Sequence, residues 1–560
     1  MKKLFALLLA VVMVVGLFAA CVQDPKPTET QKPTETQPQG TDGTTEGTEP
    51  TEPAFEYPVK NPVSFEYNTW QSTFQAHHET MNEIPMMQEW TKVTGVSPEF
   101  KITSTDEDFN LMLAGGKATM VDVFQKTDAQ LPGGPQGCLD EEIIIPLNDL
   151  IDKYMPNLKA LLEKYPELDA AVKTADGTYY VIPGLNPEVP QNPATQGPFI
   201  SKHMMDKYNI TTVPETIGEW YTMLKTFKDK GVEAPFGSNF STLAKAGPFI
   251  GAYLPFPNSD GIITDGRAGK LSFAYTSDAY KEYLKTLKKW YDEGLFGADF
   301  FSIASKTINA NITSDKSIAG YGYIGSGIQT LTTTGKKTNP DFEFVAPKYP
   351  SLEKGGVANG NVKYPVMYPG WGAYITTACE EEKYESVCRW FDYAYSAEGL
   401  LLTNFGIEGE TYEMKDGEPI SLDSYLNPSK EGWSTTQYQR EYTMSGSGLV
   451  WMQDGRAYPQ TLTMESASNA LKLWYDQNAE EKWQDRTIPT LAFSSEDNET
   501  KAGITAELIN YCLAEAANFV KGDKDLDKDW SAYVKACEGF GSKTLVGLYQ
   551  YYYDAYFEKF

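Results

Sequence analysis

The sequence predicts an α/β protein with two lobes, and two observations support this expectation. About 500 of the 560 residues remain once the N-terminal segments described below are set aside, which is more than one hydrophobic core usually serves. Segments typical of β-strands alternate along these residues with amphipathic helices, as in proteins built on mixed or parallel sheets. A hydrophobic content of 41% and an aromatic content of 13% are typical of a globular body.

Residues 1–20 are expected to be a signal peptide. Two lysines follow Met1, and the apolar run at residues 4–18 carries no charge and is shorter than the ~20 residues that a spanning helix needs. Phe18-Ala19-Ala20-Cys21 resembles the bacterial lipobox, in which the cysteine is diacylated and the chain is cut before it. We expect Cys21 to be the lipidation site, with two acyl chains as a stable anchor. An ordinary cleaved signal with an incidental cysteine is the alternative.

Residues 21–56 are expected to form a lipidated, disordered linker. Thr, Glu, Pro, Gln and Gly dominate it, with eight acidic residues and two lysines between Val22 and Glu56. Such a segment buries too little apolar surface to offset its conformational entropy. Proline and charge repulsion extend it, to about 110 Å at full stretch. It would tether a folded body to a membrane.

Charge and cysteine content exclude several classes of protein. The net charge of −28 disfavours a nucleic-acid binder or direct docking on anionic lipid. The chain has three histidines and no C-x-x-C motif, so we expect no metal site and no cofactor. Beyond Cys21 there are five cysteines, which we interpret as buried apolar residues; a Cys512–Cys537 bridge stays open. They are Cys138, Cys379, Cys388, Cys512 and Cys537.

The first folded residues predict a repeating β-α-β arrangement. Strands are expected at 63–67, 98–103 and 120–125, and helices at 84–94 and 106–113. Gly95 stands where a helix C-cap needs positive φ, and acids occupy the first turn of the second helix. Residues 146–168 are predicted to be helical in two pieces broken at Pro156, and 176–185 to form a turn and a strand.

The later helices are predicted from their caps and apolar stripes. Thr216 and Glu219 form a capping box for a helix over 217–231 whose stripe includes Trp220. Further helices are expected at 277–294, 382–395, 511–519 and 530–536.

We find no complete motif for catalysis in the sequence. Residues 320–325 (GYGYIG) match G-x-G-x-x-G, but the β-branched residues that follow do not predict the helix that a dinucleotide site needs. Residues 523–530 begin like a calcium loop, yet its sixth and twelfth positions are Lys528 and Val534 rather than Gly and Glu. A pair of glycosidase carboxylates stays possible in so acidic a chain, without any pair being marked out.

Several segments together resemble one known family. They are 82–101, 106–116, 143–168, 176–185, 207–231, 390–420 (WFDYAYSAEGLLLTNFGIEGETYEMKDGEPI) and 526–541. In this order they resemble the family 1 extracellular solute-binding proteins of ABC importers, and more narrowly the large Gram-positive lipoproteins of the aldouronate and oligosaccharide type. Departures occur at Ser201-Lys202-His203 and at 250–270.

The resemblance implies a type II periplasmic-binding-protein-like fold, with two lobes that close on a ligand through a hinge. The first lobe would comprise 57–183 plus 316–370, and the second 184–315 plus 376–560. Pro183, Gly184 and Gly370 would lie where the chain crosses between lobes.

A sugar site needs aromatic platforms and polar partners, and loops after strands are the best places for them. Trp90, Trp220, Trp290 and Trp390 lie on helical stripes and are expected in the cores. The ligand-binding candidates are Trp70, Gln71, Asp122, Tyr323, Trp371 and Trp451.

These inferences predict a monomeric, membrane-anchored extracellular lipoprotein without enzymatic activity. It would capture a carbohydrate, an oligosaccharide above all, and deliver it to ABC permease subunits. A surface glycoside hydrolase or polysaccharide-binding adhesin is the alternative, and the identity of the sugar stays open, as does a peptide ligand.

Overall fold

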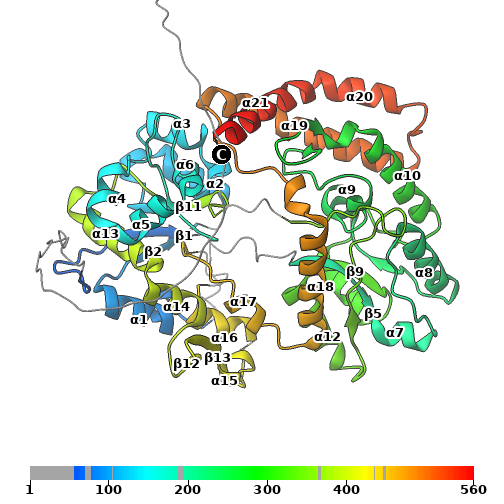
Figure 1. The fold of residues 1–560 in the computed structure, drawn as a ribbon, viewed down its shortest axis with the longest axis horizontal. Helices are drawn as coiled ribbons and strands as arrows, with labels where there is room; N and C mark the ends of the chain where they lie inside the picture. The colour runs from blue at the N-terminus through cyan, green and yellow to red at the C-terminus, as the bar shows by residue number, and fades with distance from the viewer. Residues whose placement is uncertain are drawn as a thin grey trace, which may run out of the picture. The chain divides into compact units, whose positions relative to one another are not determined.

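The computed structural model describes residues 56–69, 77–103, 105–186, 195–362, 367–433, 435–444 and 449–559. Two separate hydrophobic cores lie within them, and Figure 1 labels the helices and strands around these cores. One core runs from Val59 to Leu185 and from Tyr368 to Met452, and we call the residues around it the first lobe. The other runs from Phe199 to Ala358 and from Leu462 to Tyr553, and it defines the second lobe.

The first lobe is built on a five-stranded sheet in the order β2-β1-β3-β11-β4. β1, β2 and β3 are parallel, and β11 runs antiparallel to both β3 and β4. The strands are β1 (Glu66–Thr69), β2 (Glu99–Ile102), β3 (Val123–Thr127), β4 (Ile182–Pro183) and β11 (Trp371–Ile375). Its longer helices are α1 (Pro85–Thr94), α2 (Asp106–Ala114), α3 (Gly134–Asp140), α4 (Asn148–Tyr154), α5 (Pro156–Lys164), α6 (Pro166–Ala171), α13 (Tyr384–Asp392), α14 (Ala397–Phe405) and α16 (Thr435–Tyr442).

The second lobe is built on a four-stranded sheet in the order β10-β5-β9-β6. β9 pairs antiparallel with β5 and parallel with β6. The strands are β5 (Gln196–Ser201), β6 (Phe236–Gly237), β9 (Ala319–Tyr323) and β10 (Phe344–Val345). Its helices include α7 (Lys202–Lys207), α8 (Ile217–Asp229), α9 (Phe240–Ala246), α10 (Asp278–Asp292), α11 (Ser305–Thr313), α12 (Thr330–Lys336), α18 (Glu465–Glu481), α19 (Ser495–Lys521), α20 (Trp530–Gly539) and α21 (Ser542–Lys559).

Two small hairpins and two short helices accompany the two sheets. The hairpins are β7 (Ile262–Thr264) with β8 (Leu271–Phe273), and β12 (Tyr412–Lys415) with β13 (Glu418–Ser421). The helices are α15 (Asp423–Leu426) and α17 (Ala457–Gln460).

Local sequence signals place most helix ends correctly. Thr216 and Glu219 form the predicted capping box at the start of α8, and Gly95 takes the left-handed conformation, φ 75°, after α1. The helical stretch 146–168 breaks at Pro156, where α4 gives way to α5. α19 is much longer than the predicted 511–519 because its charged first half still forms a capped helix from Ser494.

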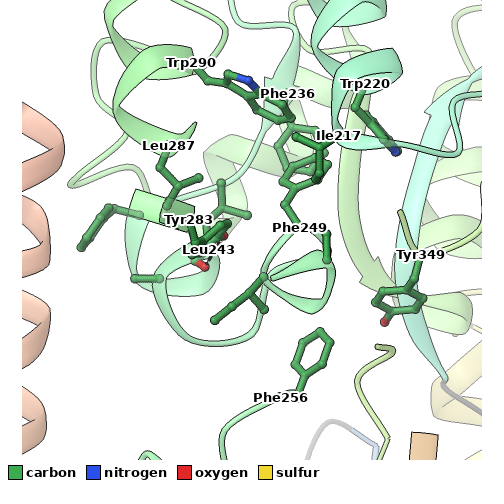
Figure 2. Close-up of a cluster of buried hydrophobic side chains, with 14 of the residues drawn as sticks. Ile217, Trp220, Phe236, Leu243, Phe249, Phe256, Tyr283, Leu287, Trp290 and Tyr349 are labelled. Carbon is green, nitrogen blue, oxygen red and sulfur yellow. Dashed lines mark hydrogen bonds between the residues drawn. The ribbon is translucent and has the colours of Figure 1, made fainter. Parts of the chain in front are cut away.

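Aromatic packing dominates the core of the second lobe (Figure 2). The ring of Phe249 lies edge-on to Trp220 and to Trp290, with ring centroids 5.2 and 4.8 Å apart. Tyr283, which is fully buried, donates its hydroxyl to the carbonyl of Leu243 at 2.7 Å. Offset and edge-on aromatic pairs add to the hydrophobic term, so the tryptophans on helical stripes are core residues, as predicted.

The division into lobes differs from the expected one. Residues 316–362 contribute β9 and β10 to the second sheet, and 376–452 pack on the first core. The reason is strand pairing across the sequence: β9 finds its partners β5 and β6 in the second sheet, while α13 and α14 follow β11 directly. No local sequence pattern predicts which sheet these strands and helices join.

The glycine-rich stretch at 320–325 is followed by a helix that the sequence did not predict. It forms β9 and a π-helical turn at Ile324–Gln329, after which α12 begins. Three threonines of α12 donate their hydroxyls to carbonyls four residues earlier, as Thr332 does to Ile328 at 2.7 Å, a bond that threonine can form within a helix. Because Gly320 lies inside β9 rather than after it, the phosphate-binding arrangement does not arise.

Candidate ligand-binding site

The strand ends of the first sheet meet at one edge. Trp371 at the start of β11 pairs with Thr127 at the end of β3, and Gly372 pairs with Pro183 at the end of β4. Since β1, β2 and β3 run in the same direction, their carboxyl ends lie at this edge as well. Ligands of open α/β sheets bind outside the carboxyl ends of strands, so this edge is where a site is expected.

The chain crosses between the lobes three times, and the crossings start side by side at this edge. The N–H of Asn186 donates to the carbonyl of Met367 at 2.8 Å, and the N–H of Leu185 donates to Trp451 at 3.0 Å. On the second lobe, Gln196 pairs with Tyr323, so the first crossing arrives where β9 ends. We call the residues 183–186, 367–371, 451–458 and 321–329 the seam.

The indole of Trp371 lies directly on the backbone of Gly184. A methyl group placed on Gly184 would stand 2.4 Å from Cζ2 of the indole, far inside van der Waals contact. The Gly184 N–H also donates to the Trp371 carbonyl at 3.0 Å. Trp371 and Trp451 are both partly buried against the first core, so the structure brings these two predicted residues together at the seam.

Tyr323 presents the most accessible aromatic ring of the seam. It stands at the end of β9 with 54% of its surface exposed. Tyr321 shares its face of the strand because side chains two residues apart point the same way. The Tyr321 hydroxyl accepts a hydrogen bond from Asn361 Nδ2 at 3.0 Å. An exposed ring beside hydroxyl and amide groups suits the alternating C–H faces and hydroxyls of a sugar.

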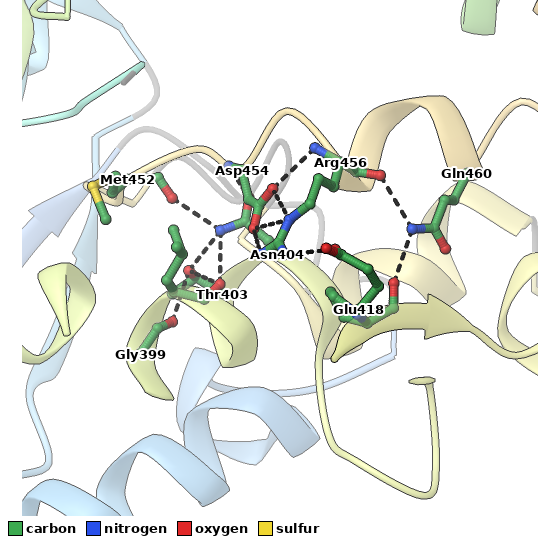
Figure 3. A network of polar contacts seen from close by, with 10 residues as sticks. Gly399, Thr403, Asn404, Glu418, Met452, Asp454, Arg456 and Gln460 are labelled. Carbon is green, nitrogen blue, oxygen red and sulfur yellow. Dashed lines mark hydrogen bonds and ion pairs between the residues drawn. The ribbon is translucent and has the colours of Figure 1, made fainter. Parts of the chain in front are cut away.

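A polar network anchors the third crossing to the first lobe (Figure 3). Asn404 on α14 accepts the N–H of Asp454 at 2.8 Å and donates to the carbonyl of Met452 at 2.9 Å. Arg456 donates to both carboxylate oxygens of Asp454, and to Glu418 on β13 at 2.8 Å. These bonds, with that to Asp454 first, hold the pKa of Arg456 above its usual value.

The other end of the third crossing is tied to the second lobe. Gln329 donates to the carbonyl of Thr461 at 3.1 Å and accepts the N–H of Met464 at 3.3 Å. Tyr458 interacts with the backbone of Gly325, and burial raises the pKa of its phenol to about 12. The crossing is thus a defined segment held at both ends.

Asp122, another predicted ligand-binding residue, does not lie at this edge of the sheet. It precedes β3 and therefore lies at the opposite end of the sheet from Trp371. Lys383 contacts both of its carboxylate oxygens at 2.9 Å, and the N–H of Glu66 donates to it at 2.7 Å. The side chain is fully engaged in holding two strands and the segment before α13.

The remaining predicted residues fall into two groups. Pro183 and Gly370 lie at the seam: the Pro183 carbonyl accepts the Tyr395 hydroxyl at 2.6 Å, and Gly370 has φ 81°. Trp70, Gln71 and Cys21 lie outside the described residues. Within the described ranges, no group of three or more His, Cys, Asp or Glu residues could hold a metal ion, and no helix has the length and apolar character to cross a membrane.

Sequence reasoning missed four residues of this region. Tyr321 could have been found from the alternation in GYGY, which places it on the same face as Tyr323. Tyr458 in the seam, and Asn361 and Asp128 beside it, carry no local signal, since only long-range contacts bring them there.

Comparisons with known proteins agree with this fold. No family model matches the chain. The fructooligosaccharide ABC transporter substrate-binding protein FusA of Streptococcus pneumoniae is 23% identical over 489 residues, which are 85% of this chain and 87% of FusA. A structure of a FusA EF-hand mutant in complex with fructo-nystose matches with TM-score 0.70, 20% identity and coverage of 89% of this chain and 100% of that one. This chain is homologous to an ABC-transporter substrate-binding protein.

Two further comparisons give a partial match to a lipoprotein and a solved structure of the same fold. Lipoprotein LipO of Bacillus subtilis is 29% identical over 227 residues, which are 38% of this chain and 43% of LipO. The alginate-binding protein AlgQ2 without calcium ion matches with TM-score 0.69 and 22% identity, over 89% of this chain and 99% of AlgQ2. The predicted α/β fold is therefore confirmed, and the homology to FusA fits the predicted family.

Proposed function

We propose that this protein is an extracellular solute-binding lipoprotein that captures an oligosaccharide at the seam and delivers it to an ABC permease. The observation that carries the proposal is the homology to FusA along 85% of the chain. The partly buried Trp371 and Trp451 and the exposed Tyr323 add the aromatic surface that a sugar requires. FusA and AlgQ2 are named as binding proteins rather than as enzymes.

A panel of trisaccharides tests this function directly. Kestose, maltotriose, xylotriose and cellotriose would each be added to the purified protein, and the melting temperature recorded. A ligand at 100 times its dissociation constant stabilises the folded state by about 2.7 kcal/mol, which is about 3 °C for a body of this size. Absence of any shift, together with shortened products in a hydrolysis assay, would favour the glycoside hydrolase instead.

Matched tryptophan variants place the site. Trp371→Ala should weaken binding of the active trisaccharide by about 1–3 kcal/mol, as loss of an aromatic anchor does. Trp220→Ala is the control: its ring is fully buried in the second core, so the variant should lose about 3–5 kcal/mol of stability and keep its affinity. Affinity that is unchanged in Trp371→Ala would move the site away from this part of the seam.

The membrane anchor is proposed at Cys21. The lipobox-like sequence before it supports this, and one relative is itself named a lipoprotein. Cys21→Ser should leave the protein with its signal uncleaved or release it from the membrane. A variant that is still processed and partitions into detergent like the wild type would contradict the anchor.

A further inference from the structure

A buried carboxylate with three tyrosine partners lies where the second crossing joins the first sheet. Asp128 follows β3 directly. Its Oδ1 accepts the hydroxyls of Tyr368 at 2.7 Å and Tyr374 at 2.6 Å, and its Oδ2 accepts that of Tyr180 at 3.0 Å. The three phenols come from three segments: the returning crossing, β11, and the residues before β4.

The same residue fixes the backbone of the crossing. The N–H of Asp128 donates to the carbonyl of Gly370 at 3.0 Å. Gly370 has φ 81°, a conformation that favours glycine, and leads directly into Trp371. A methyl group on Gly370 would stand 3.9 Å from Asp128 Oδ2 and 3.8 Å from the Thr490 methyl. Thr490 lies in a stretch that packs on the second core. Gly370, which Asp128 holds, therefore faces the second lobe.

Stability alone does not account for a carboxylate here. Asp128 is half-buried as a residue; burial raises the pKa of its carboxyl, and the hydrogen bonds from the three phenols lower it in part. Within the described part of the chain no ion pair with Lys or Arg compensates the charge. A raised carboxyl pKa means that the ionised form destabilises the folded state relative to the unfolded one.

We propose that Asp128 is a positioning residue for ligand capture. Its carboxylate and N–H together hold Tyr368, Gly370 and the start of β11, and so set the indole of Trp371 over Gly184 at the seam. This proposal rests on the function proposed above, and it assigns to Asp128 no direct contact with the sugar.

The first experiment compares two buried carboxylates. Asp128→Asn keeps the shape but replaces one acceptor by a donor that faces Tyr180. Asp392→Asn is the control, since Asp392 is 1% exposed and accepts hydrogen bonds from Asn157 and Leu158 at the start of α5. Calorimetry would use kestose, or the panel trisaccharide that stabilises the wild type most.

Asp128→Asn should weaken binding at least tenfold with little change in the melting temperature of the ligand-free protein. Asp392→Asn should lower that melting temperature and change affinity less than twofold. Equal affinity of Asp128→Asn and wild type would overturn the proposal, and so would an equal loss in both variants, because lobe stability would then be the common cause.

A pH profile separates positioning from packing. The titratable groups that act on the Asp128 carboxyl are Tyr180, Tyr368 and Tyr374, whose pKa values burial raises well above 10, so they stay neutral. As the pH falls through the raised pKa of Asp128, wild-type affinity should decline towards that of Asp128→Asn. The variant itself should show no change in that window, and parallel profiles would contradict the proposal.

A ligand-free measurement keeps the two proposals distinguishable. Acrylamide quenching of tryptophan fluorescence, recorded with and without Trp371→Phe, reports the accessibility of Trp371 alone. Asp128→Asn should increase this accessibility, whereas Asp392→Asn should not. If no trisaccharide binds the wild type, the proposed function fails, while this readout still decides whether Asp128 sets the position of the indole.

Discussion

Gly184→Ala tests the close approach on which the seam depends. The backbone of Gly184 has no positive φ, so alanine is allowed there and the substitution adds only a methyl group. That methyl would lie 2.4 Å from Cζ2 of Trp371, whereas carbon atoms need about 3.5 Å. The indole must therefore move by about 1 Å or the strand must shift.

The magnitude follows from the cost of overpacking. Such insertions cost about 1–3 kcal/mol, and replacing glycine by alanine returns about 0.4–1 kcal/mol through the unfolded state. We expect a net loss of about 0.5–2 kcal/mol, or about 2–6 °C in melting temperature if the first lobe unfolds as a unit. Affinity for the panel trisaccharide should fall about tenfold, which corresponds to about 1.4 kcal/mol.

A double-mutant cycle identifies the cause. In a Trp371→Ala background the indole is gone, so Gly184→Ala should cost nothing or stabilise slightly, and should not lower affinity further. Thermal melts and calorimetry of the four proteins give the coupling between the two sites. If Gly184→Ala costs the same in both backgrounds, the contact between glycine and indole is not what the substitution disturbs, and the reasoning fails.

Three further predictions concern single contacts. Tyr323→Ala should weaken sugar binding by about 1–3 kcal/mol and leave the ligand-free melting temperature unchanged, because the ring is 54% exposed; unaltered calorimetric affinity would exclude it from the site. Arg456→Met leaves the carboxylate of Asp454, 1% exposed, without its ion pair, and should cost about 1–3 kcal/mol in thermal melts, although partial exposure of the arginine reduces the effect. Cys512 and Cys537 have their Sγ atoms 3.6 Å apart, so oxidised glutathione should pair them during refolding, and peptide mapping without reduction should find this bridge rather than one between Cys379 and Cys388.

The described helices show which elements local sequence patterns can predict. α1, α8 and α10 lie where their stripes and caps predict, because caps and amphipathic stripes act over one or two turns of the chain. The start of α19 and the threonine-rich α12 were missed, since the first has a weak stripe and the second depends on hydroxyl bonds to its own backbone.

The candidate site could be predicted only in part. Trp371, Trp451 and Tyr323 were selected as aromatics beside strands, and the structure brings the first two together at one sheet edge. Asp122 was selected by the same reasoning and lies at the other end of the sheet, because alternation along a strand does not tell which end meets the crossing. Asp128 could not be selected, since its three tyrosine partners are between 52 and 246 residues away in the sequence.

The sequence by itself predicted the fold class and most of the helices, because these follow from composition and from interactions between residues a few positions apart. Only the tertiary structure decided which lobe each segment of the chain joins and which side chains meet at the seam. β9 pairs with β5, more than a hundred residues before it, and β11 is inserted between β3 and β4. Such pairings depend on the burial of whole sheet faces and on backbone hydrogen bonds between distant strands. Neither can be recognised from the residues next to a strand in the sequence.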